Sequence, residues 1–140
     1  MSRVAGRRVV IGLAIAAVAA AIITGLVVIG SPAEERIRRL DERRAGDLAQ
    51  LKGAVDSYWT SRNRLPESID ELAEERPYLR TYDRDPVSRE PYAYRLLDAD
   101  AYELCAEFDR ASDGELPYMI EWSHEAGTRC FRLVPQKTTR

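Results

Sequence analysis

The stretch that most constrains this chain is a run of 21 residues without a charge, at 9–29. A helix of that length is about 31 Å long, at about 1.5 Å per residue, which is close to the hydrocarbon thickness of a bilayer. The run therefore predicts an uncleaved transmembrane helix after a short basic N-terminus at 1–8. A cleaved signal peptide is the alternative, because Arg7 and Arg8 resemble a charged n-region and small residues follow them.

The charges on either side of this run favour an N-terminus inside the cell. The arginines before the run abut it, whereas those after it begin at Arg36 and are mixed with acids. The two cysteines, Cys105 and Cys130, lie beyond the run and suit an oxidising compartment. We therefore expect a single-pass protein of the inner or cytoplasmic membrane, with an extracytoplasmic C-terminal domain.

Residues 33–61 carry apolar side chains mostly at steps of three and four, the period of a helix with one apolar face. Pro32 suits the first helical turn, and acids follow it near the positive end of the helix dipole. The apolar stripe is thin where Arg44 interrupts it and becomes dense further on, where it includes Leu51, Val55, Tyr58 and Trp59. We expect an exposed stalk at 30–47 that continues as a packed helix.

The arginines from Arg36 to Arg44 are interleaved with acids, which predicts a solvated helix surface with salt bridges rather than a patch for anionic lipid. The whole chain has a formal net charge of −2, and the part beyond Gly30 is the more acidic part. No basic face is expected, so nucleic acid is excluded as a partner.

The rest of the chain predicts an α+β domain at 48–134, followed by a flexible tail at 135–140. A short helix is expected to begin with Pro66 in its first turn and to stop at Pro77. A turn-rich loop follows, and then three or four antiparallel strands of alternating polarity are expected at 92–97, 102–108, 117–122 and 129–134. The amphipathic helix is expected to pack on the aromatic-rich face of this sheet.

Cys105 and Cys130 fall on the face of their strands that points away from the core, so a disulfide across the strands is geometrically reasonable. Closing a loop of about 25 residues stabilises a chain by about 3.5 kcal/mol in the chain-entropy model. Two separate thiols are the alternative. A metal site is not expected, because two cysteines and one distant histidine do not make a closed set of four ligands.

Neither catalysis nor a cofactor is expected. His124 is the only histidine, and it fits a turn better than a catalytic triad. The sequence has no glycine-rich phosphate loop. Asp109, Asp113 and Glu115 leave calcium binding open beside an ordinary polar loop, since their spacing is not that of an EF-hand. We expect a non-catalytic protein.

The order of these segments resembles the pilin-like family, above all the major pseudopilin of type II secretion systems. In that family a helix with a tyrosine-rich end precedes a Leu-Pro turn, and an Asp-Pro loop leads to a Pro-Tyr-x-Tyr strand. The matching residues here are Leu65, Pro66, Asp85, Pro86, Pro91, Tyr92 and Tyr94. The resemblance implies a structural or protein-interaction subunit of the bacterial envelope, whose partners are the membrane and other envelope proteins or further copies.

The N-terminal segment lacks the family's processing signature. A pilin precursor has a glycine followed by a hydrophobic residue, and a glutamate five positions into the mature helix. Here Gly6 precedes Arg7, and no acid occurs before Glu34. These positions favour the alternative of a free-standing, anchored binding or sensing domain that does not polymerise.

Overall fold

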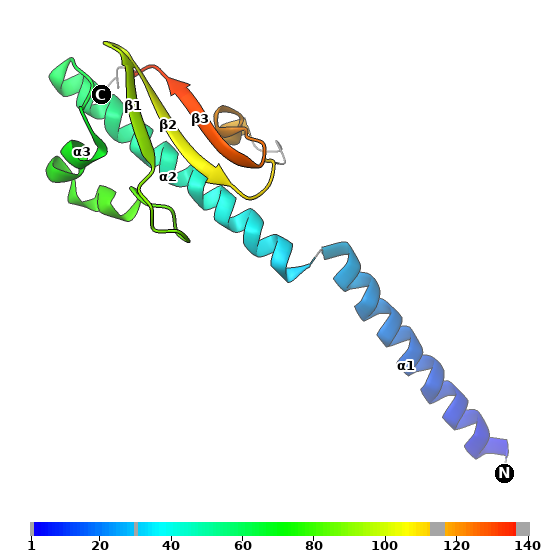
Figure 1. Cartoon of the computed structure of the whole chain (residues 1–140). Coiled ribbons are helices and arrows are strands. Elements are labelled where there is room, and N and C mark those ends of the chain that lie inside the picture. The colour runs from blue at the N-terminus through cyan, green and yellow to red at the C-terminus, as the bar shows by residue number, and fades with distance from the viewer. Residues whose placement is uncertain (1, 30, 113–116, 137–140) are drawn as a thin grey trace. The chain divides into compact units, whose positions relative to one another are not determined.

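The computed structural model describes residues 2–29, 31–112 and 117–136. The chain divides into two compact units, residues 1–36 and 37–140. The first unit contains the long helix α1 (Ser2–Ile29), and the second contains a three-stranded antiparallel sheet with helices (Figure 1). The chain is therefore of the α+β class, as expected.

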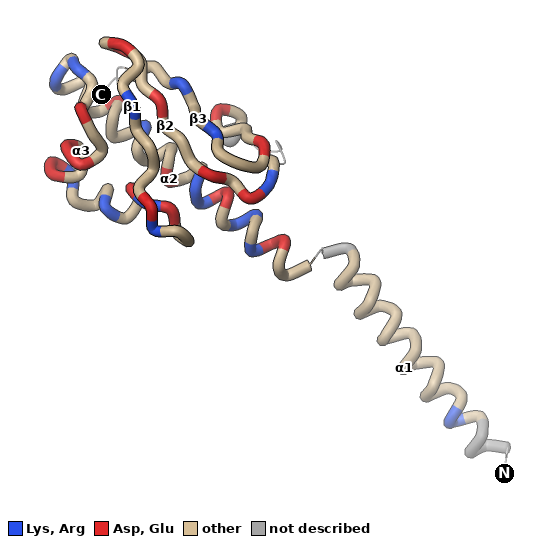
Figure 2. The backbone as a smooth tube through the Cα atoms, in the orientation of Figure 1, with Lys and Arg blue, Asp and Glu red and all other residues tan. Residues whose placement is uncertain are grey.

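Helix α1 contains the uncharged run and confirms that this stretch is helical. Within the described residues, one helix near the N-terminus is long and apolar enough to cross a membrane, and its apolar window has no buried residue. In the part of α1 that Figure 2 colours by residue type, the charged residues lie near the N-terminal end. The length and composition of α1 thus meet the requirements for a membrane span.

Helix α2 (Pro32–Arg62) has a defined signal at each end. At its start, Glu34 N–H donates to Ser31 Oγ at 3.2 Å, and Ser31 N–H donates to the Glu34 carboxylate at 3.4 Å. This reciprocal pair is a capping box. At its end, Asn63 has a φ of 53° and its N–H donates to the Trp59 carbonyl at 2.8 Å, as in a left-handed C-terminal cap.

The packing of α2 begins earlier than the sequence suggests. Asp41, Arg44 and Ala45 are already buried, although they lie in the segment 30–47 that was expected to be an exposed stalk. The apolar stripe beyond them enters the core, with Trp59 packed against its edge; the buried residues are Leu48, Leu51, Ala54, Val55 and Tyr58.

The sheet has the strand order β1-β2-β3, formed by β1 (Ala93–Asp98), β2 (Ala101–Phe108) and β3 (Gly127–Leu133). Both strand pairs are antiparallel. As the alternation predicted, one face of the sheet joins the α2 residues in the core, with the side chains of Tyr102, Leu104, Ala106, Phe108, Phe131 and Leu133.

Two expected elements differ in the structure. Residues 117–122 form a 3-10 helix, η2 (Pro117–Trp122), rather than a strand. Strand β3 pairs directly with β2, and η2 places Trp122 in the core, where its ring lies 5.0 Å from that of Phe131.

The short helix α3 (Ile69–Glu75) begins after Pro66 rather than with it. The side chain of Ser68 caps α3 by accepting the Glu71 N–H at 3.2 Å, so the capping hydroxyl, and not the proline, sets the start. Pro77 opens the 3-10 helix η1 (Pro77–Thr81), which confirms that α3 stops before it.

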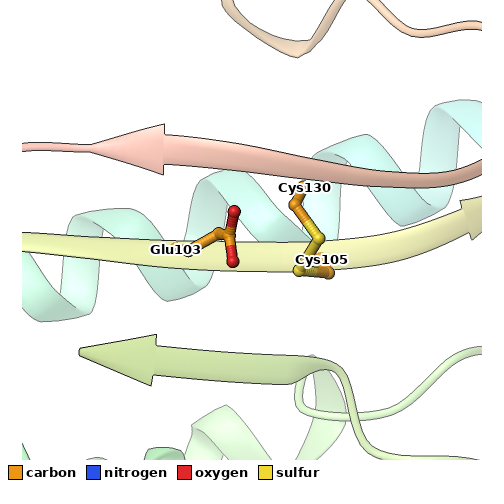
Figure 3. Close-up of side chains that lie close together, drawn as sticks. All are labelled: Glu103, Cys105 and Cys130. Carbon is orange, nitrogen blue, oxygen red and sulfur yellow. A yellow bond between two sulfur atoms is a disulfide. The ribbon is translucent and has the colours of Figure 1, made fainter. Parts of the chain in front are cut away.

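Cys105 and Cys130 lie directly opposite each other on β2 and β3, and they form a disulfide with their Cα atoms 4.0 Å apart (Figure 3). Neither residue belongs to the core cluster, in agreement with the expected off-core face. The guanidinium of Arg95, on β1, lies 3.7 Å from each sulfur. The bond therefore joins two adjacent strands on the face opposite α2.

Replacing both cysteines, Cys105→Ala with Cys130→Ala, is expected to lower the free energy of unfolding by about 3.5 kcal/mol, because the bond closes a loop of 25 residues. Urea unfolding of the full-length protein in detergent, followed by circular dichroism, measures the change. Thr128→Ala on the same face is the control, expected within about 0.5 kcal/mol of the wild type. Equal stability of the double variant and the wild type would contradict the expectation.

Candidate functional site

The guanidinium of Arg44 is paired with three carboxylates, and the Arg44 side chain is 7% exposed. Arg44 lies on α2 and donates to Asp41 at 2.7 Å, to Asp85 at 2.6 Å and to Asp109 at 2.6 Å. Asp41 is one turn earlier on the same helix, Asp85 is in the loop before β1, and Asp109 follows β2. We call Arg44 and these three aspartates the Arg44 cluster. It joins three separate parts of the domain.

The helical period explains why Arg44 enters the core. It precedes Leu48 by four residues and Leu51 by seven, so the three side chains share one face of α2. A buried guanidinium must be paired to offset its desolvation. Burial lowers the pKa of Arg44, but the hydrogen bonds to the three aspartates outweigh it and raise that pKa above its ordinary value.

Asp41 holds the chain where β2 ends. Its two carboxylate oxygens accept the backbone N–H groups of Asp109 at 3.1 Å and of Arg110 at 3.0 Å. One of them also accepts the hydrogen bond from Arg44. The carboxylate thus fixes the exit from the sheet against the first half of α2.

Asp85 organises the loop that contains the Asp-Pro motif. Its Oδ1 accepts the N–H groups of Val87 and Ser88, each at 2.8 Å, while its Oδ2 faces Arg44. Such a turn is a usual role for aspartate. Burial raises the pKa of Asp85, but the bonds from Arg44 and the two amides together hold it below its ordinary value. Asp85 is therefore a charged structural anchor at neutral pH.

The two tyrosines of the Pro-Tyr-x-Tyr motif connect β1 to the helical part. The Tyr92 hydroxyl donates to Asp47 on α2 at 3.0 Å, and the Tyr94 hydroxyl donates to the Pro66 carbonyl at 2.8 Å. Burial is the largest cause of the raised pKa of both hydroxyls. Burial likewise raises the pKa of Asp47. Both hydroxyls act here as hydrogen-bond donors in structural contacts.

The other expected motif residues are distributed between core and surface. Leu51, Val55, Tyr58 and Leu65 are buried in the core, and Pro66 is buried beside it, whereas Pro86 is half-buried and Pro91 is exposed. The motif residues thus lie where loops and strands meet the helices, and they do not line one common cavity.

Acidic and sulfur groups that suggest a metal site are already engaged. Glu103, Cys105 and Cys130 have ligand atoms within 4.8 Å of one another (Figure 3). The two sulfurs are bonded to each other, and the Glu103 carboxylate lies 2.9 Å from Arg95. In this oxidised form the group offers no thiolate to a metal.

The residues considered for calcium binding, and the histidine expected in a turn, are further candidates from the sequence. Asp109 is bound by Arg44, while Asp113 and Glu115 lie outside the described residues. His124 is 7% exposed and stacks on Phe108, with ring centroids 3.6 Å apart. The histidine ring is thus a packing partner of the core.

The expectation of a solvated surface from Arg36 to Arg44 is wrong for Asp41 and Arg44. Both are buried, because Asp85 and Asp109, which are distant in the sequence, complete the pairing of Arg44. Arg38 and Glu42 do form a half-exposed ion pair, as expected. The sequence signal for the buried cluster was an arginine at the helical spacing of the apolar stripe, with acids three residues before and after it.

No family model, curated protein or solved structure matches the chain. The resemblance to pseudopilins therefore stays a prediction. The described contacts provide the physical basis for a proposal about function.

Arg44→Met is expected to lower the free energy of unfolding by about 3–5 kcal/mol, because it leaves buried carboxylates without their cation. Arg43→Met, at an exposed neighbouring position, is the matched control and is expected within about 0.5 kcal/mol of the wild type. Chemical denaturation of the full-length protein measures both. A loss for Arg44→Met no larger than that of the control would show that the cluster contributes no net stability.

The depressed pKa of Asp85 predicts a loss of stability in acid. A carboxylate with a lowered folded-state pKa stabilises the fold above its unfolded pKa of about 3.9, and the contribution disappears as the pH falls through the folded value. Denaturation between pH 6 and pH 2 is expected to show a smaller acid-induced loss for Asp85→Asn than for the wild type. Asp47→Asn is expected to make the acid-induced loss larger. The pKa of Asp47 is raised in the folded protein, so its protonation in acid stabilises the fold, and the variant lacks this contribution. Parallel pH curves would contradict both assignments.

Proposed function

We propose that this protein is a non-catalytic, membrane-anchored structural or protein-interaction subunit of the bacterial envelope, with a pseudopilin-like domain. Its anchor is α1, which acts in the membrane, and its C-terminal domain lies outside the cytoplasm. It works by packing α1 and the surfaces of its domain against partner proteins.

The observation that carries this proposal is the contrast between α1 and the domain. The apolar window of α1 has no buried residue, whereas the domain has a core of its own. An apolar helix of this length has the dimensions of a bilayer span. These two observations support a membrane anchor followed by a domain with its own apolar core.

The pairing of polar groups supports a non-catalytic role. Within the described residues, the carboxylates of the Arg44 cluster and the hydroxyls of Tyr92 and Tyr94 form structural hydrogen bonds. A catalytic acid or base needs a position facing a substrate, with its proton free to move. These side chains instead hold the Asp-Pro loop and β1 to the helices, which suits a rigid interaction domain.

The position of the disulfide supports the extracytoplasmic side. Cys105 and Cys130 are bonded across β2 and β3, and such bonds persist mainly in oxidising compartments. The arginines that abut α1 at its N-terminal end favour the same orientation.

A free-standing anchored domain that does not polymerise is the second candidate. It is favoured by Arg7 after Gly6 and by the lack of an acid before Glu34. A processed pilin-like subunit would instead carry its hydrophobic residue and glutamate in one N-terminal helix.

The intact mass of the protein from membranes of its native host tests the anchor and the disulfide together. We expect the full-length mass, in the membrane fraction, with both thiols alkylated only after reduction. Loss of the first six residues with N-methylation would favour a processed, polymerising pseudopilin. A soluble product that begins near Gly30 would contradict the anchored subunit, because α1 would then be a cleaved signal.

A further inference from the structure

A groove of about 660 Å³ lies along one side of α2, between this helix and η2. Its helical wall is built from small residues, with Gly46, Ala49 and Gly53 one turn apart, and Trp122 contributes the opposite wall. A Cβ atom on Gly46 or Gly53 would have no neighbour within 4 Å, so the space above both glycines is open. Small residues allow a second helix to approach closely.

The charged residues of the groove follow a regular order along α2. From its N-terminal end they are Arg38, Glu42, Lys52 and Asp56, so the order is cation, anion, cation, anion. Arg38 forms an ion pair with Glu42, and Lys52 forms one with Asp56. Glu121 of η2 lies 3.8 Å from Lys52 and adds a second acid at the far end.

We propose that this groove is the contact surface for a second copy of the chain, paired through antiparallel α2 helices. When a second copy of the helix runs in the opposite direction, its charges are opposite in sign to those of the first helix at each position. With a two-fold axis at residue 47, Arg38 lies opposite the partner's Asp56, and Glu42 lies opposite the partner's Lys52.

The charge order distinguishes antiparallel from parallel pairing. Parallel helices in register would place each charge against its own kind. A parallel pair shifted by one turn would match Arg38 with the partner's Glu42 and Lys52 with the partner's Asp56, which uses half of the opposite-charge contacts. The antiparallel pair uses all of them and is isologous, which is the commonest symmetry of protein dimers.

This pairing goes beyond the proposed function, because it identifies one partner as a second copy and gives the register. It does not depend on whether α1 is processed. Its failure would leave the anchored-subunit proposal in place, and the mass measurement tests that proposal separately.

Cysteine cross-linking in membrane vesicles from cells that express the full chain tests the register. Gly46→Cys introduces a thiol one residue from the axis, so the two copies of this position are separated by about 3 Å along the helices. Gly53→Cys introduces a thiol six residues from the axis, which gives about 18 Å along the helices. Both positions have open space for the side chain.

With a mild oxidant, Gly46→Cys is expected to give at least tenfold more disulfide-linked dimer than Gly53→Cys on a non-reducing gel. Equal cross-linking of the two variants would indicate parallel pairing or random collision and would overturn the proposal. So would the absence of a linked dimer for Gly46→Cys.

Charge reversal in the Gly46→Cys background tests the complementarity. Glu42→Lys and Lys52→Glu are each expected to reduce the dimer yield at least fivefold, because each opposes like charges across the axis. Co-expression of the two variants should restore the yield, since each mixed pair regains opposite charges. Thermal melts of every variant check folding, and a mixture that stays as low as the single variants would contradict the pairing.

Discussion

The buried guanidinium of Arg44 is the interaction on which the arrangement of the domain depends. It draws together α2, the loop before β1 and the end of β2 through Asp41, Asp85 and Asp109. Removing one partner of a buried ion pair costs about 3–5 kcal/mol, a large share of the 5–15 kcal/mol that stabilise an ordinary domain. The apolar core packs α2 on the sheet, and the Arg44 cluster sets how the loops join them.

This internal pairing bears on function by deciding which surfaces are left for partners. The buried carboxylates and tyrosine hydroxyls are occupied in holding the Asp-Pro loop and β1. The apolar helix α1 has the length and composition of a membrane span, and the groove along α2 has open space above its small residues. The proposals of anchoring and of self-association rest on these two features.

The sequence predicted the features that depend on local period, and it failed where a distant residue decides. Alternation in 102–108 and 129–134 placed Cys105 and Cys130 on one sheet face, and the structure joins them. Arg44 was expected in solvent, because nothing local shows that Asp85 and Asp109 will meet it. The segment at 117–122 was expected to be a strand, but it forms a 3-10 helix whose Trp122 is buried in the core. Its apolar pattern alone does not distinguish these two structures.

Hydrogen exchange at the amides of Val87 and Ser88, compared between the wild type and Arg44→Met, tests the central role of Arg44 most directly. Both amides donate to Asp85, whose other oxygen is held by the guanidinium. If Arg44 anchors the loop, both amides will exchange much faster in the variant than in the wild type. The amides that pair β2 with β3 will still exchange only through global unfolding. Unchanged protection at Val87 and Ser88 would contradict the account, because the loop would then hold its shape without Arg44.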